Sequence, residues 1–234
     1  ERFDDFFIDG RPFLDKMVLK IIRDPATRTI GLENGEIDFY AFENVPTNIN
    51  RLKKNAKLNV TPDGYAAIGP IDWLAFNTKS GKTADVNVRR AIAYAIDRDF
   101  ILKAIMLGVA DEARTGIHPG SPYYEPNVEA YDIDIEKANK ILDDAGYKKG
   151  SDGMRFGLNV DFGWPGLRPN AEYTKAALKK IGIDVTVRQS ADFPTWAQTV
   201  SNHNFDLTWD TVFNWGDPVI GVHRTYQTSN IKKG

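Results

Sequence analysis

Residues 77–101 read NTKSGKTADVNVRRAIAYAIDRDFI, and this stretch decides the fold class. Its apolar side chains recur at the spacing of one helix face, which predicts a helix that begins at Asp85 and buries that face against a core. Asp97 is expected to cap a second helix that ends at Gly108. The residues just before, 71–77, are typical of a strand. A strand followed by covering helices indicates an α/β protein.

The alternation of strands and helices continues on both sides of this stretch. Toward the N-terminus we expect strand 15–23, a helix capped by Asp24 and ended by Asn34-Gly35, strand 36–40 and helix 47–55. Toward the C-terminus we expect a long ordered loop at 110–128, helix 134–142, strand 155–160, helix 170–181, strand 183–187, helix 193–200 and strand 205–209. This order predicts a mixed sheet flanked by helices.

The composition excludes several classes of protein. With 234 residues, 42% of them hydrophobic and 26% charged, the chain has the composition of a soluble globular protein with one large or two small domains. A net charge of -2, with no long run of one sign, argues against a nucleic-acid partner. The absence of cysteine excludes disulfides and thiol catalysis, and no stretch has the roughly 18 apolar residues that span a bilayer.

Common catalytic and metal-binding motifs do not occur. The chain has no nucleophile elbow, no phosphate-binding loop and no dinucleotide fingerprint. Its three histidines, His118, His203 and His223, are far apart in sequence, so we expect neither a metal nor a cofactor. The acidic run around Asp134 and Glu136 lacks the glycine and distal glutamate of a calcium loop, and we interpret it as the start of a helix.

Aromatic side chains gather in the last third of the chain. Trp164 and Trp215 each lie beside glycine or proline outside a periodic element, which is typical of residues that wall a cleft for an organic ligand, whereas Trp196 is expected in the core. The same region holds four acids that a glycoside hydrolase could use in pairs, which keeps a carbohydrate-active hydrolase open as the alternative: Asp161, Asp206, Asp210 and Asp217. A third possibility, a pure interaction protein, predicts a broad exposed apolar patch in place of a concave site.

The stretch 77–101 resembles the family 5 extracellular solute-binding proteins. An asparagine after an apolar strand is followed by a loop, then by Val-Arg-Arg-Ala-Ile and Ala-Ile-Asp-Arg. Segments 131–147, 178–185 and 205–218, the last ending in Trp-Gly-Asp-Pro, resemble later landmarks of the same family in the same order. Segment 12–39 resembles the preceding region, so the resemblance covers essentially the whole chain.

This resemblance implies a lobe of the type II periplasmic-binding-protein kind, truncated at both ends. Residues 1–65 would be the end of a first lobe with the hinge region, and residues 66–234 a second lobe that closes over the ligand. The implied function is that of the substrate-binding component of an ABC importer, which delivers its solute to a membrane permease without chemical change. The implied location is periplasmic, or extracytoplasmic and membrane-associated, although this chain carries no export signal.

The resemblance also suggests where the ligand binds. Peptide-binding members use an aspartate shortly before the Asp-Pro pair to hold the ammonium group of the peptide, and Asn214 stands at that position here. An amide supplies no compensating charge, so an opine, a modified peptide or another small organic solute joins peptides as an expected ligand, with Asp210 or Asp217 as substitutes for the missing charge. The predicted ligand-binding residues are Trp209, Asp210, Asn214 and Trp215, with Trp164 and Tyr123.

Overall fold

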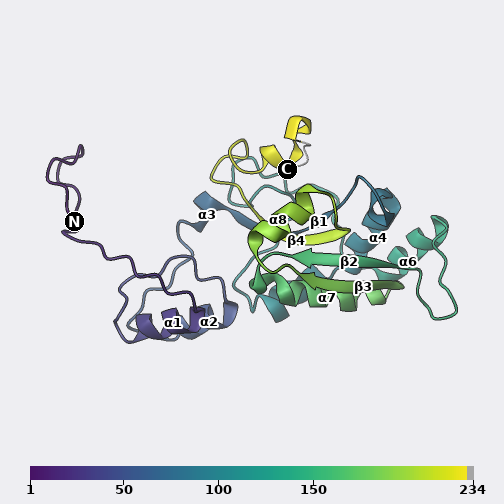
Figure 1. Ribbon diagram of the computed structural model, residues 1–234, viewed down its shortest axis with the longest axis horizontal. Coiled ribbons are helices and arrows are strands. Elements are labelled where there is room, and N and C mark those ends of the chain that lie inside the picture. Colours follow the sequence, from purple (N-terminus) through teal and green to yellow (C-terminus); the bar gives the residue numbers. More distant parts are fainter. Residues whose placement is uncertain (231–234) are drawn as a thin grey trace. The chain divides into compact units, whose positions relative to one another are not determined.

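The computed structural model describes residues 1–230, and it divides the chain into two compact units, Glu1–Asn59 and Val60–Gly234 (Figure 1). The first unit contains helices α1 (Pro25–Glu33) and α2 (Pro46–Leu52). As predicted, Asp24 caps α1 by accepting a hydrogen bond from the Thr27 amide at 2.7 Å, and Gly35 follows the helix with φ +75°. An Arg51–Glu33 ion pair joins the two helices.

The two strands predicted in the first unit are wrong. Residues 15–23 and 36–40 are extended or bent without strand pairing, and the first strand of the described chain begins only at Pro70. The β-forming side chains are present, but a strand also needs a neighbour for its backbone groups, and the described residues of this unit offer none. Leu19 and Ile21 are accordingly exposed.

The second unit is built on a four-stranded mixed sheet with the order β1-β4-β2-β3. Its strands are β1 (Pro70–Phe76), β2 (Phe156–Phe162), β3 (Ile183–Gln189) and β4 (Leu207–Phe213). Strand β2 runs parallel to both β3 and β4, whereas β1 is antiparallel to β4. All four strands were predicted, and the mixed sheet flanked by helices is confirmed.

Helices connect these strands in the predicted order. The longer ones are α4 (Val86–Ala95), α6 (Ile135–Asp144), α7 (Arg168–Lys179) and α8 (Phe193–Ser201), and the short ones are α3 (Tyr65–Ile68), α5 (Arg98–Phe100) and α9 (His223–Tyr226). The helix predicted from Arg98 changes type after Phe100 and continues as a π-helix over Ile101–Ile105. No helix among residues 1–230 is both long and apolar enough to cross a membrane.

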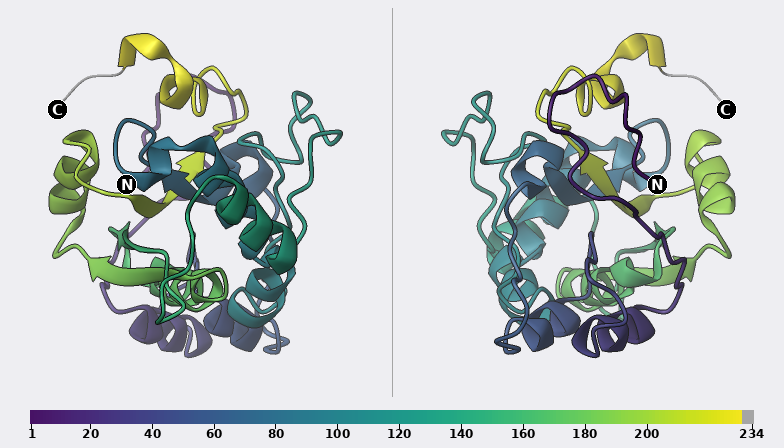
Figure 2. Two further views of the ribbon diagram at one scale, coloured as in Figure 1. Left: turned by 90° about the vertical axis from the view of Figure 1, so that its right-hand side faces the viewer. Right: turned by 90° about the vertical axis from the view of Figure 1, so that its left-hand side faces the viewer.

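The two faces of the sheet are covered differently. On one face, Trp209 of β4 is buried and its indole N–H donates to Thr174 of α7 at 2.9 Å. The next residue back, Thr208, points to the opposite face because side chains alternate along a strand, and it accepts a hydrogen bond from Trp196 of α8. Helices α7 and α8 therefore lie on opposite faces of the sheet, as Figures 1 and 2 show.

The main core lies on the α7 face. There α4, α6 and α7 pack their apolar sides against the sheet, and the largest fully buried side chain is Phe162 at the end of β2. The predicted apolar face of α4 is buried as expected, with Val88, Ala91 and Ile92 inaccessible to solvent. Burial of this kind, at about 25 cal/mol per Å² of apolar surface, supplies the main favourable term of folding.

We expect the replacement Asp134→Ala to destabilise the second unit by about 1 kcal/mol, because Asp134 caps α6 by accepting from the Lys137 amide at 2.8 Å. Urea denaturation checks the value, and Asp132→Ala, two residues before the cap, serves as the matched control. Added calcium should leave both unfolding curves unchanged. A calcium-dependent shift would instead support the calcium loop.

Candidate functional site

The parallel strands β2, β3 and β4 all end at one edge of the sheet, which we call the carboxyl edge. Strand β4 is paired over different lengths on its two sides. Its pairing with β2 ends at Phe162 and Trp209, whereas its pairing with β1 continues to Pro70 and Phe213. Residues 210–213 of β4 thus project beyond β2 with β1 as their paired neighbour. Ligands of α/β proteins bind outside such carboxyl ends, in loops that a rigid sheet positions.

Asp210 lies at the base of this projection. It is half-buried, and it faces Trp73 across the β1–β4 pair. Burial raises the pKa of Asp210 above the usual value for a carboxyl group, the Thr211 amide and the nearby Trp73 indole partly offset that rise, and the charge of Asp72 adds to it. Asp210 Oδ1 accepts from the adjacent Thr211 amide at 2.7 Å.

Trp73 is a feature that the sequence interpretation missed. Its buried indole nitrogen has no hydrogen-bond partner of acceptable geometry among the described residues. The indole nonetheless interacts with the Asp210 carboxylate, whose pKa it lowers, so Trp73 and Asp210 form one polar pair at this edge of the sheet. The signal in the sequence was a tryptophan in a strand otherwise rich in aliphatic side chains, and only the β1–β4 register places it opposite Asp210.

Asn214 is buried and has a structural role. Its side-chain oxygen accepts from the His118 amide at 3.0 Å, and its side-chain nitrogen donates to the Gly69 carbonyl at 3.1 Å. Only 2% of Asn214 is exposed. Both ends of the amide are thus engaged in holding the loop at His118 and the start of β1 against the end of β4, and a ligand contact of Asn214 stays a prediction.

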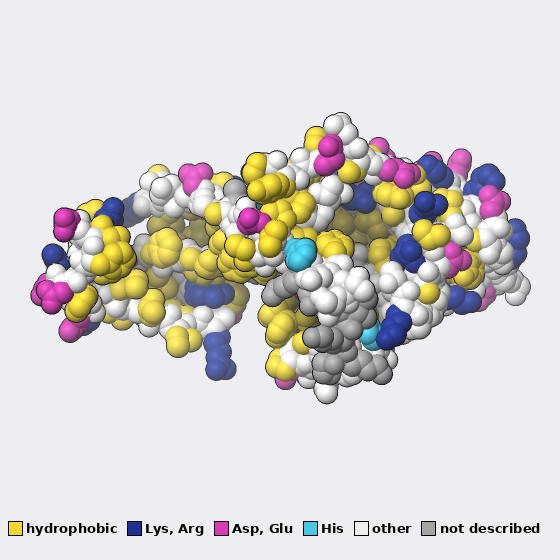
Figure 3. Space-filling model, turned by 90° about the horizontal axis from the view of Figure 1, so that it is seen from above, with side chains coloured by type: hydrophobic (Ala, Val, Ile, Leu, Met, Phe, Trp, Pro, Cys, Tyr) yellow, Lys and Arg dark blue, Asp and Glu magenta, His cyan; other side chains and the backbone are white. Residues whose placement is uncertain are grey.

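The other predicted residues divide into exposed and buried ones. Trp215 is 51% exposed with φ +52°, and its ring lies 5.5 Å from that of Phe213 at the tip of the projection. Tyr123 is exposed in the long loop. Trp209 faces the core instead. Hydrophobic side chains are also visible at the surface in the space-filling view (Figure 3). A few residues after Trp215 in the chain, Val219 and Ile220 are exposed as well.

Trp164 lies directly after β2 and belongs to an aromatic cluster. Its ring stacks on Phe193 of α8 with 4.7 Å between centroids and 15° between planes, and Phe193 in turn lies 5.4 Å from Trp196. The structure thus brings Trp164 and Phe193 together from separate segments at the carboxyl edge. Sequence reasoning named the first as a ligand contact and missed the second.

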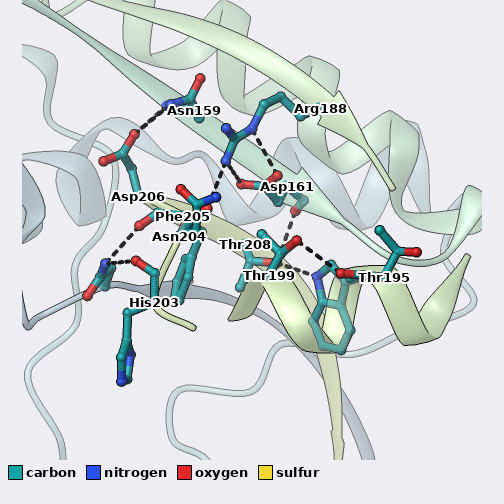
Figure 4. A network of polar contacts seen from close by, with 12 residues as sticks. Asn159, Asp161, Arg188, Thr195, Thr199, His203, Asn204, Phe205, Asp206 and Thr208 are labelled. Carbon is teal, nitrogen blue, oxygen red and sulfur yellow. Dashed lines mark hydrogen bonds and ion pairs between the residues drawn. The ribbon is translucent and has the colours of Figure 1, made fainter. Parts of the chain in front are cut away.

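A network of polar side chains lies on the α8 face of the sheet (Figure 4). Arg188 of β3 donates two hydrogen bonds to the carboxylate of Asp161 on the neighbouring strand β2, at 3.0 and 2.7 Å. The backbone oxygen of Asp161 accepts from Thr208, whose hydroxyl also receives the Trp196 indole N–H at 2.8 Å. Arg188 therefore ties β3 to β2, and the network continues to the base of the aromatic cluster.

The acids of the hydrolase alternative are bound individually. Asp161 is ion-paired with Arg188, and Asp206 accepts from the backbone and side-chain nitrogens of Asn159 at 2.8 and 3.0 Å. Asp217 caps its own turn by accepting from the Val219 amide. These contacts account for three of the four carboxylates as structural groups, and the paired-acid hydrolase is not supported.

Two hollows of the described surface lie along α8 and beside the long loop. The larger, about 490 Å³, follows α8 and is lined by Asp192, Pro194, Thr195, Ala197, Gln198 and Ser201. The smaller, about 230 Å³, is lined by Arg98, Glu112, Arg114, Val128, Glu129, Ala130 and Tyr131. Neither of these two hollows is lined by a predicted ligand-binding residue, although the larger one includes Asp192 and Pro194 on either side of Phe193.

A mixed sheet with helices on both faces and an open carboxyl edge is the architecture of type II periplasmic binding proteins, and solved structures of that class match it. The oligopeptide-binding protein AppA from Bacillus subtilis, in complex with a nonapeptide, superimposes with a TM-score of 0.74 over 92% of this chain and 44% of its own, at 24% identity. DppA from Helicobacter pylori, in complex with the peptide STSA, gives 0.70 over 81% and 35%, at 26% identity. NikA from Brucella suis, in complex with Fe(III)-EDTA, gives 0.67 over 82% and 40%, at 27% identity.

The chain belongs to the bacterial extracellular solute-binding proteins of family 5, whose model, described as the middle part of that family, matches residues 1–233. Among curated relatives, the dipeptide-binding protein of Escherichia coli is 29% identical over 79% of this chain and 34% of its own length. Heme-binding protein A of Haemophilus influenzae is 31% identical over 74% and 31%. The chain therefore spans about a third of the length of these relatives.

Proposed function

We propose that this chain is part of the substrate-binding component of an ABC importer, which captures peptides or related small solutes and passes them to a membrane permease without changing them chemically. The match to the family 5 model over residues 1–233 carries this proposal. We further propose that the protein works outside the cytoplasm, in the periplasm or at the outer surface of the membrane, and that residues 1–65 and 66–234 belong to two lobes.

A solute held between two lobes stabilises the closed form only through contacts that the open form lacks. The carboxyl edge fits such a surface, because it carries a half-buried carboxylate beside the Trp73 indole, together with exposed rings. The proposed contact residues are Asp210, Trp215, Trp164 and Tyr123, with Trp73 added. Asn214 and Trp209 are buried and would support these contact residues, Asn214 through its bonds to His118 and Gly69 and Trp209 through its bond to Thr174.

Calorimetric titration of the protein, expressed from its complete coding sequence, tests the proposal. The panel holds dipeptides, longer peptides, opines and oligosaccharides. We expect saturable binding of at least one peptide or opine, without turnover of the ligand over hours by mass spectrometry. A folded protein that binds none of these solutes would refute the proposed function.

Asp210→Asn should weaken the binding of solutes with a free ammonium group about tenfold or more, because a charge-assisted hydrogen bond contributes about 1.5–3 kcal/mol. N-acetylated forms of the same solutes should bind both proteins equally. The matched control is Asp184→Asn, which neutralises an exposed carboxylate on β3. Equal losses for free and acetylated solutes would show that Asp210 acts on folding instead.

The same contact should make binding dependent on pH. Burial raises the pKa of Asp210, so its carboxylate gains a proton at a higher pH than an ordinary aspartate does. The affinity for an ammonium-bearing solute should therefore fall as the pH is lowered through that raised pKa, while the ammonium keeps its charge. In Asp210→Asn this part of the pH dependence should disappear.

A further inference from the structure

The three rings at the carboxyl edge form a graded stack. Trp196 is buried, Phe193 is 44% exposed, and Trp164 is 42% exposed. The outer two are nearly parallel, with 15° between their planes, while the inner pair is tilted by 30°. A large apolar surface is thus presented by two side chains from different segments, one after β2 and one at the start of α8.

The base of this stack is rigid. The Trp196 indole donates to Thr208, which in turn donates to the Asp161 backbone oxygen at 3.1 Å. The ring also lies against Gly163, where an added Cβ would come within 2.9 Å of Trp196 Cγ. Glycine at this position permits the close contact, and the buried hydrogen bonds fix the ring plane. The inner ring is therefore ordered before any ligand arrives, and Phe193 lies against it with 5.4 Å between centroids, which lowers the entropic cost of binding at this end of the stack.

The charges around the stack give little preference for a cation. The nearest acid in sequence, Asp192, is engaged as the α8 cap, where it accepts from the Thr195 amide at 2.8 Å. Arg168, at the first position of α7 and close to Trp164 in sequence, has its guanidinium 3.8 Å from Glu172. A planar apolar group gains stacking area here, whereas an ammonium group would find the Asp192 carboxylate already bonded and the Glu172 carboxylate already paired with Arg168.

The stack also adjoins the proposed ligand site. The residues that follow the last β2–β4 pair are Gly163 on one strand and Asp210 on the other. Trp196 rests on the first of these, so the aromatic cluster begins where the half-buried carboxylate lies. A solute anchored at Asp210 would have the rings within reach of its next group.

We propose that Trp164 and Phe193 form a subsite for a planar aromatic group of the solute, such as the side chain of a tryptophan or phenylalanine residue in a peptide. This inference rests on the proposed function, and it adds a preference that the family assignment does not contain. Trp196 is a positioning residue for the subsite, and Trp164 supplies the outer contact face.

The test compares tripeptides that differ only at the central residue, which is tryptophan, phenylalanine, cyclohexylalanine, lysine or alanine. Calorimetry on the protein from its complete coding sequence should give about three- to tenfold tighter binding for tryptophan and phenylalanine than for alanine, as expected for one aromatic stacking contact. Cyclohexylalanine, equal in size but not planar, should lose most of this gain. In Trp164→Ala the ratios should fall to about one.

The matched control is Phe100→Ala, which removes another exposed, stacked ring, since Phe100 is 47% exposed and lies 5.0 Å from Tyr173 of α7. This variant should keep the aromatic preference. Quenching of tryptophan fluorescence by a nitrophenylalanine tripeptide, lost in Trp164→Phe, provides a second measurement that a purely structural role would not change.

Three outcomes would overturn the inference. The first is equal binding of all five tripeptides by the unchanged protein, which refutes the subsite but leaves the proposed function standing. The second is a preference for the lysine tripeptide, which would assign the rings to cation binding. The third is a loss of stability in Trp164→Ala with unchanged ratios, which would mean that another part of the protein covers the stack. Absence of any binding refutes the proposed function itself.

Discussion

Replacing Arg188 with methionine should destabilise the second unit by about 2–3 kcal/mol, because the change leaves the Asp161 carboxylate buried without its partner. Removing one member of a buried ion pair costs about 3–5 kcal/mol, and the lower range applies here because the Arg188 side chain is 38% exposed while that of Asp161 is 5% exposed. Urea denaturation measures the loss. Asp161→Asn is the matched variant. We expect it to lower the free energy of unfolding by only about 1 kcal/mol, because the partly exposed guanidinium of Arg188 can be hydrated instead.

The pH dependence of this loss tests its cause. Burial raises the pKa of Asp161, and Arg188 lowers it part of the way back. Without Arg188 the pKa rises further, and the variant then gains stability when the carboxyl group takes up a proton. The deficit relative to the unchanged protein should therefore be largest at neutral pH and shrink as the pH falls through the raised pKa. A deficit independent of pH would point to lost packing by the arginine stem.

Asn214→Asp should destabilise the protein by about 2–3 kcal/mol, although it introduces the residue that peptide-binding members of the family are expected to carry. The new oxygen would replace the amide nitrogen that donates to the Gly69 carbonyl at 3.1 Å, so two acceptors would face each other in a buried position. Thermal and urea unfolding measure the loss, with the exposed Asn127→Asp as the control.

The same variant separates two roles for position 214. If the side chain supports the loop, Asn214→Asp loses stability and gains no affinity for solutes with a free ammonium group. A variant that is as stable as the unchanged protein and binds such solutes more tightly would show that position 214 faces the ligand after all.

The longer helices of this chain were predictable because their signals are local, whereas the short helices α3 and α9 were not predicted. Asp24, Asp85, Asp134 and Asp192 each accept a backbone amide at the start of a helix, and each is followed by a periodic apolar face. The four strands of the second unit were equally clear. The strands predicted before Pro70 failed because strand formation depends on a neighbour, which local sequence does not reveal.

The candidate site was predictable only in outline. The aromatic character of residues 162–215 indicated a ligand surface, but side-chain direction depends on register. One step along β4 turns Trp209 into the core and Asp210 toward the opposite face. The side-chain contacts of Asn214 join residues 96 and 145 positions apart, which no local pattern indicates.

Arg155, whose side chain is buried in the second unit, is another residue whose contacts could not be predicted from local sequence. Arg155 immediately precedes β2, and its side chain is 1% exposed. It donates to Asp143, Asn139 and the backbone oxygens of Tyr147 and Ile181. In sequence it is an ordinary charged residue after a turn. Its role in joining the ends of α6 and α7 to β2 follows only from the packing of three distant segments.

The projection of β4 beyond β2 at the carboxyl edge has a consequence for how the sequence of such a protein can evolve. Residues 210–213 continue past β2 with β1 as their paired partner, and Val212 is buried there while Phe213 is 37% exposed, so substitution of the exposed side chains of this ribbon leaves the packed layers beneath intact. Under the proposed function, a different solute would then be accommodated by exchanging a few side chains on this ribbon without repacking a core. Such evolution agrees with the names of two relatives, one called a dipeptide-binding protein and the other a heme-binding protein.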